Sequence, residues 1–194
     1  MADLKIKPQA GSGNKLIFQD QAGAAVMTTA DSGVTVANAT LTTPTIASMA
    51  NCTFPTGHVL QIVEGTLTVQ STTSSTSYVD SGLNASITPS SASNKILILS
   101  NMQACRSSES GASGLGLRVV RDSTALFTPG ANHNVYWGAN GGYIPWNDQY
   151  LDSPNTTSAI TYKIQYASLS SGYSVIVNQG GSFRSSITLM EIKG

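Results

Sequence analysis

The sequence has little charge, and what charge it has is evenly balanced. Only 10% of its 194 residues are Asp, Glu, Lys or Arg, less than half the share found in ordinary globular domains, and ten acids match ten bases. No basic stripe is present that could neutralise a phosphate backbone, so nucleic acid is not an expected partner. A net charge of zero favours association between protein surfaces over mutual repulsion.

Long apolar runs and clustered cysteines are also missing. The apolar runs span only a few residues, as at 96–99, so no segment is long enough to cross a bilayer. Residues 1–7 lack the apolar core of a secretory signal, so we expect synthesis in a cytoplasm, no export and no membrane partner. Cys52 and Cys105 lie far apart without a metal-binding spacing, which predicts two reduced residues in or near a core.

Helical periodicity is nearly absent, whereas short alternating or β-branched runs between turn residues recur along the chain. From residue 56 onward the expected strands are 58–63, 65–70, 78–87, 95–104, 114–121, 125–127, 158–167, 173–177 and 186–192. A bulge is expected at Glu64-Gly65, and residues 128–150 show no strand periodicity. Residues 56–194 are therefore predicted to form an antiparallel β-sandwich of the jelly-roll type in an all-β protein.

Residues 1–55 differ from the remainder because their strands are shorter and carry few large apolar side chains. Such strands need a partner to bury them, either a neighbouring rung or another copy of the chain. We interpret this region as an N-terminal arm or docking segment, although it is also compatible with the first sheet of one continuous sandwich. The candidate docking side chains are Leu4, Ile6, Leu16, Ile17, Phe18 and Val26.

An aromatic stretch at 132–150 is the one segment whose composition suggests a binding surface. It contains both tryptophans of the chain and several Asn and Asp residues. Aromatic rings beside amides and carboxylates are typical of protein interfaces and of sugar-binding surfaces, and they also pin long loops by internal packing. All three interpretations stay open for the candidate residues His133, Tyr136, Trp137, Tyr143, Trp146 and Tyr150.

Nothing in the sequence indicates a catalytic or cofactor site. His58 begins an expected strand and is interpreted as structural, and neither it nor His133 has a metal-ligand spacing. A glycan-cleaving enzyme requires paired acids, and Asp148 with Asp152 is the only close pair near aromatic residues. We therefore expect no enzyme activity, no cofactor and no metal.

Both ends of the chain resemble proteins of bacterial viruses. Residues 16–23 (LIFQDQAG) and 26–33 (VMTTADSG) resemble the openings of structural proteins of tailed bacteriophages. Residues 185–192 (SSITLMEI) resemble the last strand of the jelly-roll modules that close many phage fibre and head-decoration proteins. Those modules are similar in fold to the trimeric tumour-necrosis-factor-like sandwiches.

The resemblance implies a virion structural protein assembled inside the host. It would be a homotrimer that decorates or cements the capsid, with the arm bound to the major capsid protein or other virion proteins. An alternative is a short tail fibre that binds a host surface glycan through residues 132–150.

Overall fold

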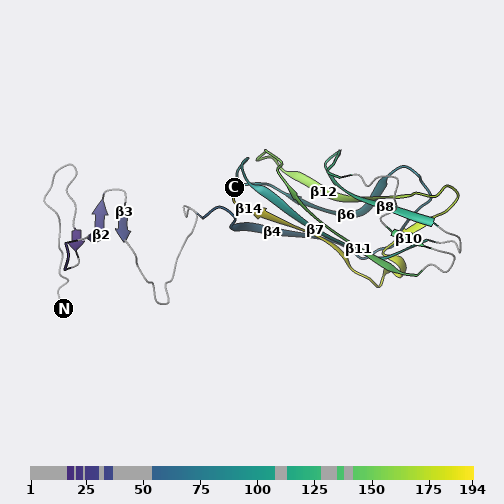
Figure 1. Cartoon of the computed structure of the whole chain (residues 1–194), viewed down its shortest axis with the longest axis horizontal. Helices are drawn as coiled ribbons and strands as arrows, with labels where there is room; N and C mark the ends of the chain where they lie inside the picture. Colours follow the sequence, from purple (N-terminus) through teal and green to yellow (C-terminus); the bar gives the residue numbers. More distant parts are fainter. Residues whose placement is uncertain are drawn as a thin grey trace. The chain divides into compact units, whose positions relative to one another are not determined.

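The computed structural model describes residues 17–19, 21–23, 25–30, 33–36, 54–107, 113–127, 135–137 and 142–194. The chain divides into two compact units, Met1–Cys52 and Thr53–Gly194. In the first unit, β1 (Ile17–Gln19), β2 (Ala25–Ala30) and β3 (Gly33–Val36) pair in order as an antiparallel sheet. Figure 1 shows the strands of each unit.

The second unit is a sandwich of two antiparallel sheets, which confirms the predicted fold class. Its elements are β4 (Val59–Leu67), β5 (Ser71–Thr73), β6 (Val79–Ile87), β7 (Lys95–Ser107), β8 (Ser113–Arg121), β9 (Thr124–Ala125), β10 (Val135–Trp137), β11 (Ile144–Asp152), β12 (Ile160–Ser168), β13 (Val175–Val177), the short 3-10 helix η1 (Gln179–Gly181) and β14 (Ser185–Ile192). One sheet has the order β10-β8-β12-β6, with β9 beside β8, and we call it the β6 sheet. The other has the order β4-β14-β7-β13-β5, with β11 beside β7, and we call it the β7 sheet.

Alternation along the strands builds the core between the two sheets. In β6 the burial alternates strictly through Leu83, Ala85 and Ile87, as predicted, and Val79 packs against the core edge. In β12 the alternating apolar residues Ile160, Tyr162, Ile164 and Tyr166 are all buried. Because side chains of a strand point to opposite faces, each strand contributes every second residue to this core.

Strand β7 is hydrogen-bonded along both edges. It pairs with β14 from Lys95 to Asn101 on one edge and with β11 from Ile96 to Cys105 on the other, and its end pairs with β13. Ala104 adopts a positive φ of 47°, a conformation that is uncommon for a residue with a side chain. Cys105, the next residue, is fully buried with a free thiol, as expected.

Two details of the sequence prediction are wrong. The segment 128–150 contains strands, because β10 pairs with β8, and β11 pairs with β7 over most of its length. Strand β4 is continuous through Glu64 and Gly65, and its pairing with β14 shifts register between Glu191 and Ile192 instead. Gly65 is required there for another reason, since a Cβ atom would overlap with the carbonyl oxygen of Asn84 on β6. The glycine therefore lets β4 approach the β6 backbone closely.

A buried carboxylate stabilises the end of the sandwich at which the C-terminus lies. Glu191 on β14 is inaccessible to solvent and accepts hydrogen bonds from Gln61 Nε2 at 2.6 Å and from Asn94 Nδ2 at 2.5 Å. The backbone N–H and the hydroxyl of Ser90 also donate to it, each at 2.7 Å. Burial opposes ionisation, but the hydrogen bonds from Asn94, Gln61 and Ser90 outweigh it and hold the pKa of Glu191 below its usual value.

The contact at Gly65 gives the first testable prediction. Gly65→Ala should lower the free energy of unfolding by about 1–3 kcal/mol, because β4 or β6 must move to make room for the methyl group. Gly142→Ala is the matched control, since a Cβ atom there meets nothing within 4 Å. Urea denaturation of both variants measures the difference, and equal stabilities would contradict the close approach of the two strands.

The second prediction concerns pH. A carboxyl group whose pKa is lowered by folding stabilises the native state above its unfolded pKa, and this contribution is lost as the pH falls through the folded value. Stability should therefore decline below about pH 4.5, the ordinary value for Glu191, and Glu191→Gln should be less stable at neutral pH and show a weaker decline. Unfolding midpoints measured from pH 7 to pH 3 test this. The exposed Glu64→Gln serves as the control, and it should follow the wild-type curve.

Candidate interaction surface

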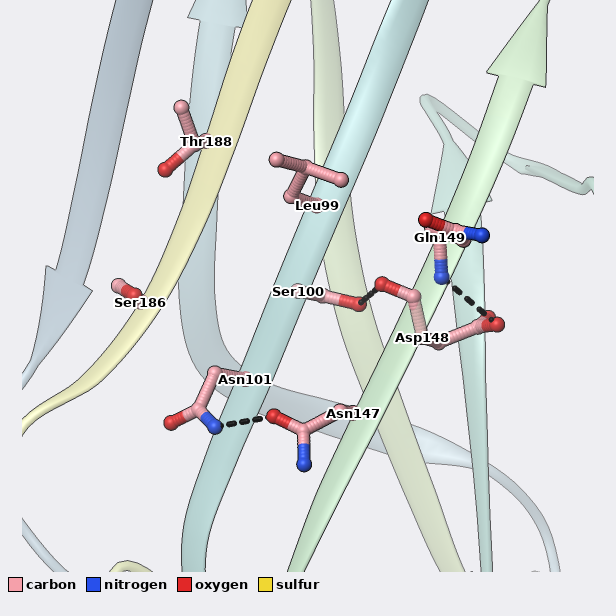
Figure 2. A pocket seen from close by; sticks show the side chains of 8 residues that line it. All are labelled: Leu99, Ser100, Asn101, Asn147, Asp148, Gln149, Ser186 and Thr188. Carbon is pink, nitrogen blue, oxygen red and sulfur yellow. Dashed lines mark hydrogen bonds between the residues drawn. The ribbon is translucent and has the colours of Figure 1, made fainter.

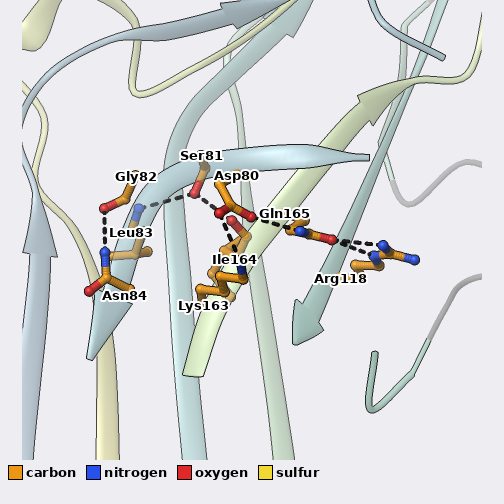
Figure 3. Close-up of polar contacts among 9 residues, drawn as sticks. All are labelled: Asp80, Ser81, Gly82, Leu83, Asn84, Arg118, Lys163, Ile164 and Gln165. Carbon is orange, nitrogen blue, oxygen red and sulfur yellow. Dashed lines mark hydrogen bonds and ion pairs between the residues drawn. The ribbon is translucent and has the colours of Figure 1, made fainter. Parts of the chain in front are cut away.

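The outer face of the β6 sheet carries paired charges. Asp80 on β6 accepts hydrogen bonds from Lys163 at 2.8 Å and Gln165 at 2.7 Å, both on β12. Gln165 in turn accepts from Arg118 on β8 at 2.7 and 3.0 Å, so one polar network crosses three strands (Figure 3). These contacts, led by the hydrogen bond from Lys163, lower the pKa of Asp80. Such a face is suited to contact with water.

The outer face of the β7 sheet is different, because apolar side chains lie side by side across its strands. The pairing register places Ile62 of β4 beside Met190 of β14, Met190 beside Leu97 of β7, and Leu97 beside Leu151 of β11. We call these four residues the apolar row. Ile62 is 60% exposed and Leu151 is 51% exposed, whereas Leu97 and Met190 are half-buried.

The next two positions along β14, β7 and β11 carry uncharged side chains, all of them polar except Leu99. One row contains Thr188, Leu99 and Gln149, and the next contains Ser186, Asn101 and Asn147. Together with Ser100 and Asp148 they line an open groove of about 470 Å³, which we call the polar groove (Figure 2). Glu64, on the neighbouring strand β4, is bound to Arg184 at 2.8 Å.

The two outer faces therefore differ in what they can contact. A contiguous apolar group on a sheet face, bordered by polar residues, is typical of a protein interaction site. The polar groove borders the apolar row on one side, and Val59, Ile192 and Lys95 lie on the other. The apolar row and the polar groove together form the candidate surface.

The structure separates the aromatic residues of 132–150 into two groups. Trp137 and Trp146 are only 2% and 9% exposed and belong to the core. Of the three interpretations of this stretch, packing within the chain therefore applies to these two residues. The Trp137 indole donates to the carbonyl of Gly142 at 2.7 Å and thereby fixes the start of β11. Tyr136, Tyr143 and Tyr150 are exposed and stay candidates for a partner or receptor surface. His133 lies outside the described residues.

The structure describes only some of the predicted docking residues. Ile17 and Phe18 on β1 are exposed, as a docking role requires. Leu4, Ile6 and Leu16 lie outside the described residues, and Val26 is placed on β2 without a described side chain. Their role in docking stays a prediction.

The acids near the aromatic stretch do not form a pair of free carboxylates. Asp152 is buried and binds Arg121 and the hydroxyl of Tyr162, each at 2.7 Å. Burial, followed by the contact with Asp152, raises the pKa of Tyr162. Asp148, four residues earlier, lines the polar groove, and partial burial raises its pKa.

His58, expected to be a partly buried structural residue, is exposed and stacks on Phe54 with a ring separation of 4.6 Å. Within the described ranges there is no group of three or more His, Cys, Asp or Glu residues that could hold a metal ion. The same ranges contain no helix long and apolar enough to span a membrane.

Sequence reasoning did not identify the apolar row or the polar groove. One signal was available, since residues 96–99 are apolar at every position. In an antiparallel sheet such a run places apolar side chains on both faces, so one of the two faces lies outside the core. Nothing in the sequence showed which residues of β4, β11 and β14 lie beside it, because the register depends on long-range pairing.

Comparisons with known proteins give weak similarities only. No protein-family model matches the chain, and no curated protein matches it by sequence. Among solved structures, a chain of infectious bursal disease virus, Gt strain, aligns with 77% of this chain at 14% identity and a TM-score of 0.40. A mutant VP2 protein of the same virus, in derived T=1 particles, aligns with 68% at 16% identity and a TM-score of 0.37. The aligned regions cover 42% and 36% of those chains, so this chain matches less than half of their length. A likeness at this level supports no conclusion about function.

Proposed function

We propose that the protein is a non-enzymatic structural component of a virion. It forms a homotrimer through its sandwich and attaches to the capsid through its N-terminal unit. The observation that carries the proposal is the contrast between the two outer faces of the sandwich. One face carries a polar network with an ion pair, and the other presents the apolar row to solvent.

A second copy of the chain is the partner that best fits the apolar row. The row contains no charge, and Glu64, on the next row of β4, is already paired with Arg184. The row itself therefore brings no like charges together, which agrees with the zero net charge of the chain. The exposed Lys95 lies at its other border. A closed cyclic assembly buries the row in every copy, whereas a monomer leaves it in water.

Attachment through the first unit is supported by its sequence and its exposed residues. The segments 16–23 and 26–33 resemble the openings of phage structural proteins. Ile17 and Phe18, in the first of these segments, present large apolar side chains to solvent.

A second candidate function, attachment to a host surface glycan, is favoured by one cluster. Tyr143 lies 6.4 Å from Phe183 between ring centroids, and the guanidinium of Arg106 lies 5.6 Å from the Tyr143 centroid. Tyr143 and Phe183 are both exposed. Tyr and Arg are enriched among the residues that contribute most to binding.

The homotrimer predicts a measurable mass. Light scattering should give three times the 20.1 kDa of the chain, and Ile62→Lys combined with Leu151→Lys should shift the protein to monomers. Burying a lysine in place of each apolar side chain should weaken association by about 100-fold or more. Ser86→Lys, on the outer face of the β6 sheet, is the control and should leave the mass unchanged. A wild-type monomer at all concentrations, or a trimer that survives the double substitution, would contradict this interface.

Capsid attachment is tested by a separate pair of variants. Ile17→Glu with Phe18→Glu should abolish binding to purified particles that lack the protein, because two exposed apolar contacts become charged. Gln21→Glu adds charge in the adjacent exposed turn and should bind like the wild type. Sedimentation with particles measures the binding. Equal sedimentation of the double variant and the wild type would rule out docking through β1.

A further inference from the structure

The polar groove has the features of a binding site for a small neutral ligand. Its lining comes from three neighbouring strands, with Ser186 and Thr188 on β14, Leu99 and Asn101 on β7, and Asn147 and Gln149 on β11 (Figure 2). Its volume of about 470 Å³ lies within the usual range for ligand sites.

Internal hydrogen bonds hold part of the lining in place. Asn101 Nδ2 donates to Asn147 Oδ1, and Asn101 Oδ1 accepts from Gln103 Nε2 at 2.6 Å. The hydroxyl of Ser100 donates to the backbone carbonyl of Asp148 at 3.2 Å, which joins β7 to β11 at the groove floor. The amide orientation of Asn101 and Asn147 is therefore set before any ligand binds, which lowers the entropy lost on binding.

Other polar groups of the lining point outward and form no hydrogen bond with the described residues. In the part of the chain that the structure describes, no protein partner is recorded for the Nδ2 atom of Asn147, the side-chain amide of Gln149, or the hydroxyls of Ser186 and Thr188. Amides and hydroxyls supply both donors and acceptors. They lie around Leu99, which is 36% exposed and offers a small apolar surface between them.

The charge of the lining excludes anionic ligands and favours a neutral one. It contains no Lys, Arg or His, so no cation is available to bind a phosphate, sulfate or carboxylate. Asp148 is the only ionisable group, and its Oδ1 already accepts from the backbone N–H of Gln149 at 2.9 Å. A ligand that offers many hydroxyl groups and an apolar C–H face, without charge, matches this set of groups.

We propose that the polar groove binds a neutral saccharide unit, with its hydroxyls on Asn147, Gln149 and the Ser186–Thr188 edge and its C–H face on Leu99. The open shape of the groove implies weak binding by one copy, and copies repeated on a particle raise the avidity. This inference is separate from the homotrimeric structural role, because the groove is complete within one chain. It extends the second candidate function by naming a ligand class and a site other than Tyr143 and Phe183.

The test uses the full-length protein and purified sugars. Neutral glucose, galactose and mannose oligosaccharides at millimolar concentrations serve as probes, with binding measured by saturation-transfer NMR. At least one oligosaccharide should bind, and Asn147→Ala with Gln149→Ala should weaken its binding about tenfold or more, since two hydrogen bonds are lost. Asn84→Ala removes an exposed amide from the outer face of the β6 sheet and should bind as the wild type does.

Three results would overturn the proposal. They are the absence of binding to any neutral probe, equal binding by the groove variant and the wild type, and loss of binding in Tyr143→Ala with Phe183→Ala while the groove variant still binds. Light scattering on the same samples tests the homotrimer independently of sugar binding. The groove variant should keep the wild-type mass whether that mass is of a monomer or a trimer.

Discussion

Residues 96–99 of strand β7 are apolar on both faces, and β7 is hydrogen-bonded along both edges. The arrangement of the neighbouring strands follows from pairing these edges and burying these side chains. Its inward residues, such as Ile96 and Ile98, are covered by the β6 sheet, and β14 and β11 occupy its two edges. A strand that is apolar on both sides needs two covered faces. The sandwich covers only one of them, so Leu97 and the rest of the apolar row form an outer surface that the isolated chain leaves in water. Association between copies is the simplest way to cover it.

The two outer faces of the sandwich differ in how readily they can bind a partner. On the β6 sheet, Asp80, Lys163, Gln165 and Arg118 bind one another, so a partner would have to replace existing interactions. On the β7 sheet, contact with a partner removes apolar area from water and breaks few internal bonds. The apolar row and the polar groove adjoin on this same face, so the proposed self-association and the proposed ligand contact lie on one side of the sandwich.

The strands with a strong local pattern could be predicted from sequence, and those defined by distant partners could not. In β6 and β12, apolar residues on the buried face alternate with more exposed residues on the other face, and both strands were predicted correctly. Strand β11 was missed because its inward positions are not uniformly apolar: Asp148 and Asp152 follow Trp146 on that face, so no hydrophobic alternation marks the strand. A glycine inside a strand commonly marks either a bulge or a close approach of another backbone, and Gly65 was interpreted as a bulge. Only the position of the Asn84 carbonyl shows that Gly65 is needed for the close approach of β4 to β6. The exposed tyrosines and buried tryptophans of 132–150 have similar neighbours in sequence, so composition alone did not separate them.

The first and last strands of the sandwich meet at one end. Gly57 N–H donates to the Lys193 carbonyl and Lys193 N–H donates to the His58 carbonyl, each at 2.8 Å, so the chain enters and leaves the sandwich at neighbouring points (Figure 1). A module with adjacent ends can be spliced into a surface loop of an unrelated host protein with little disturbance to either fold. The sandwich could thereby be transferred between proteins as one unit.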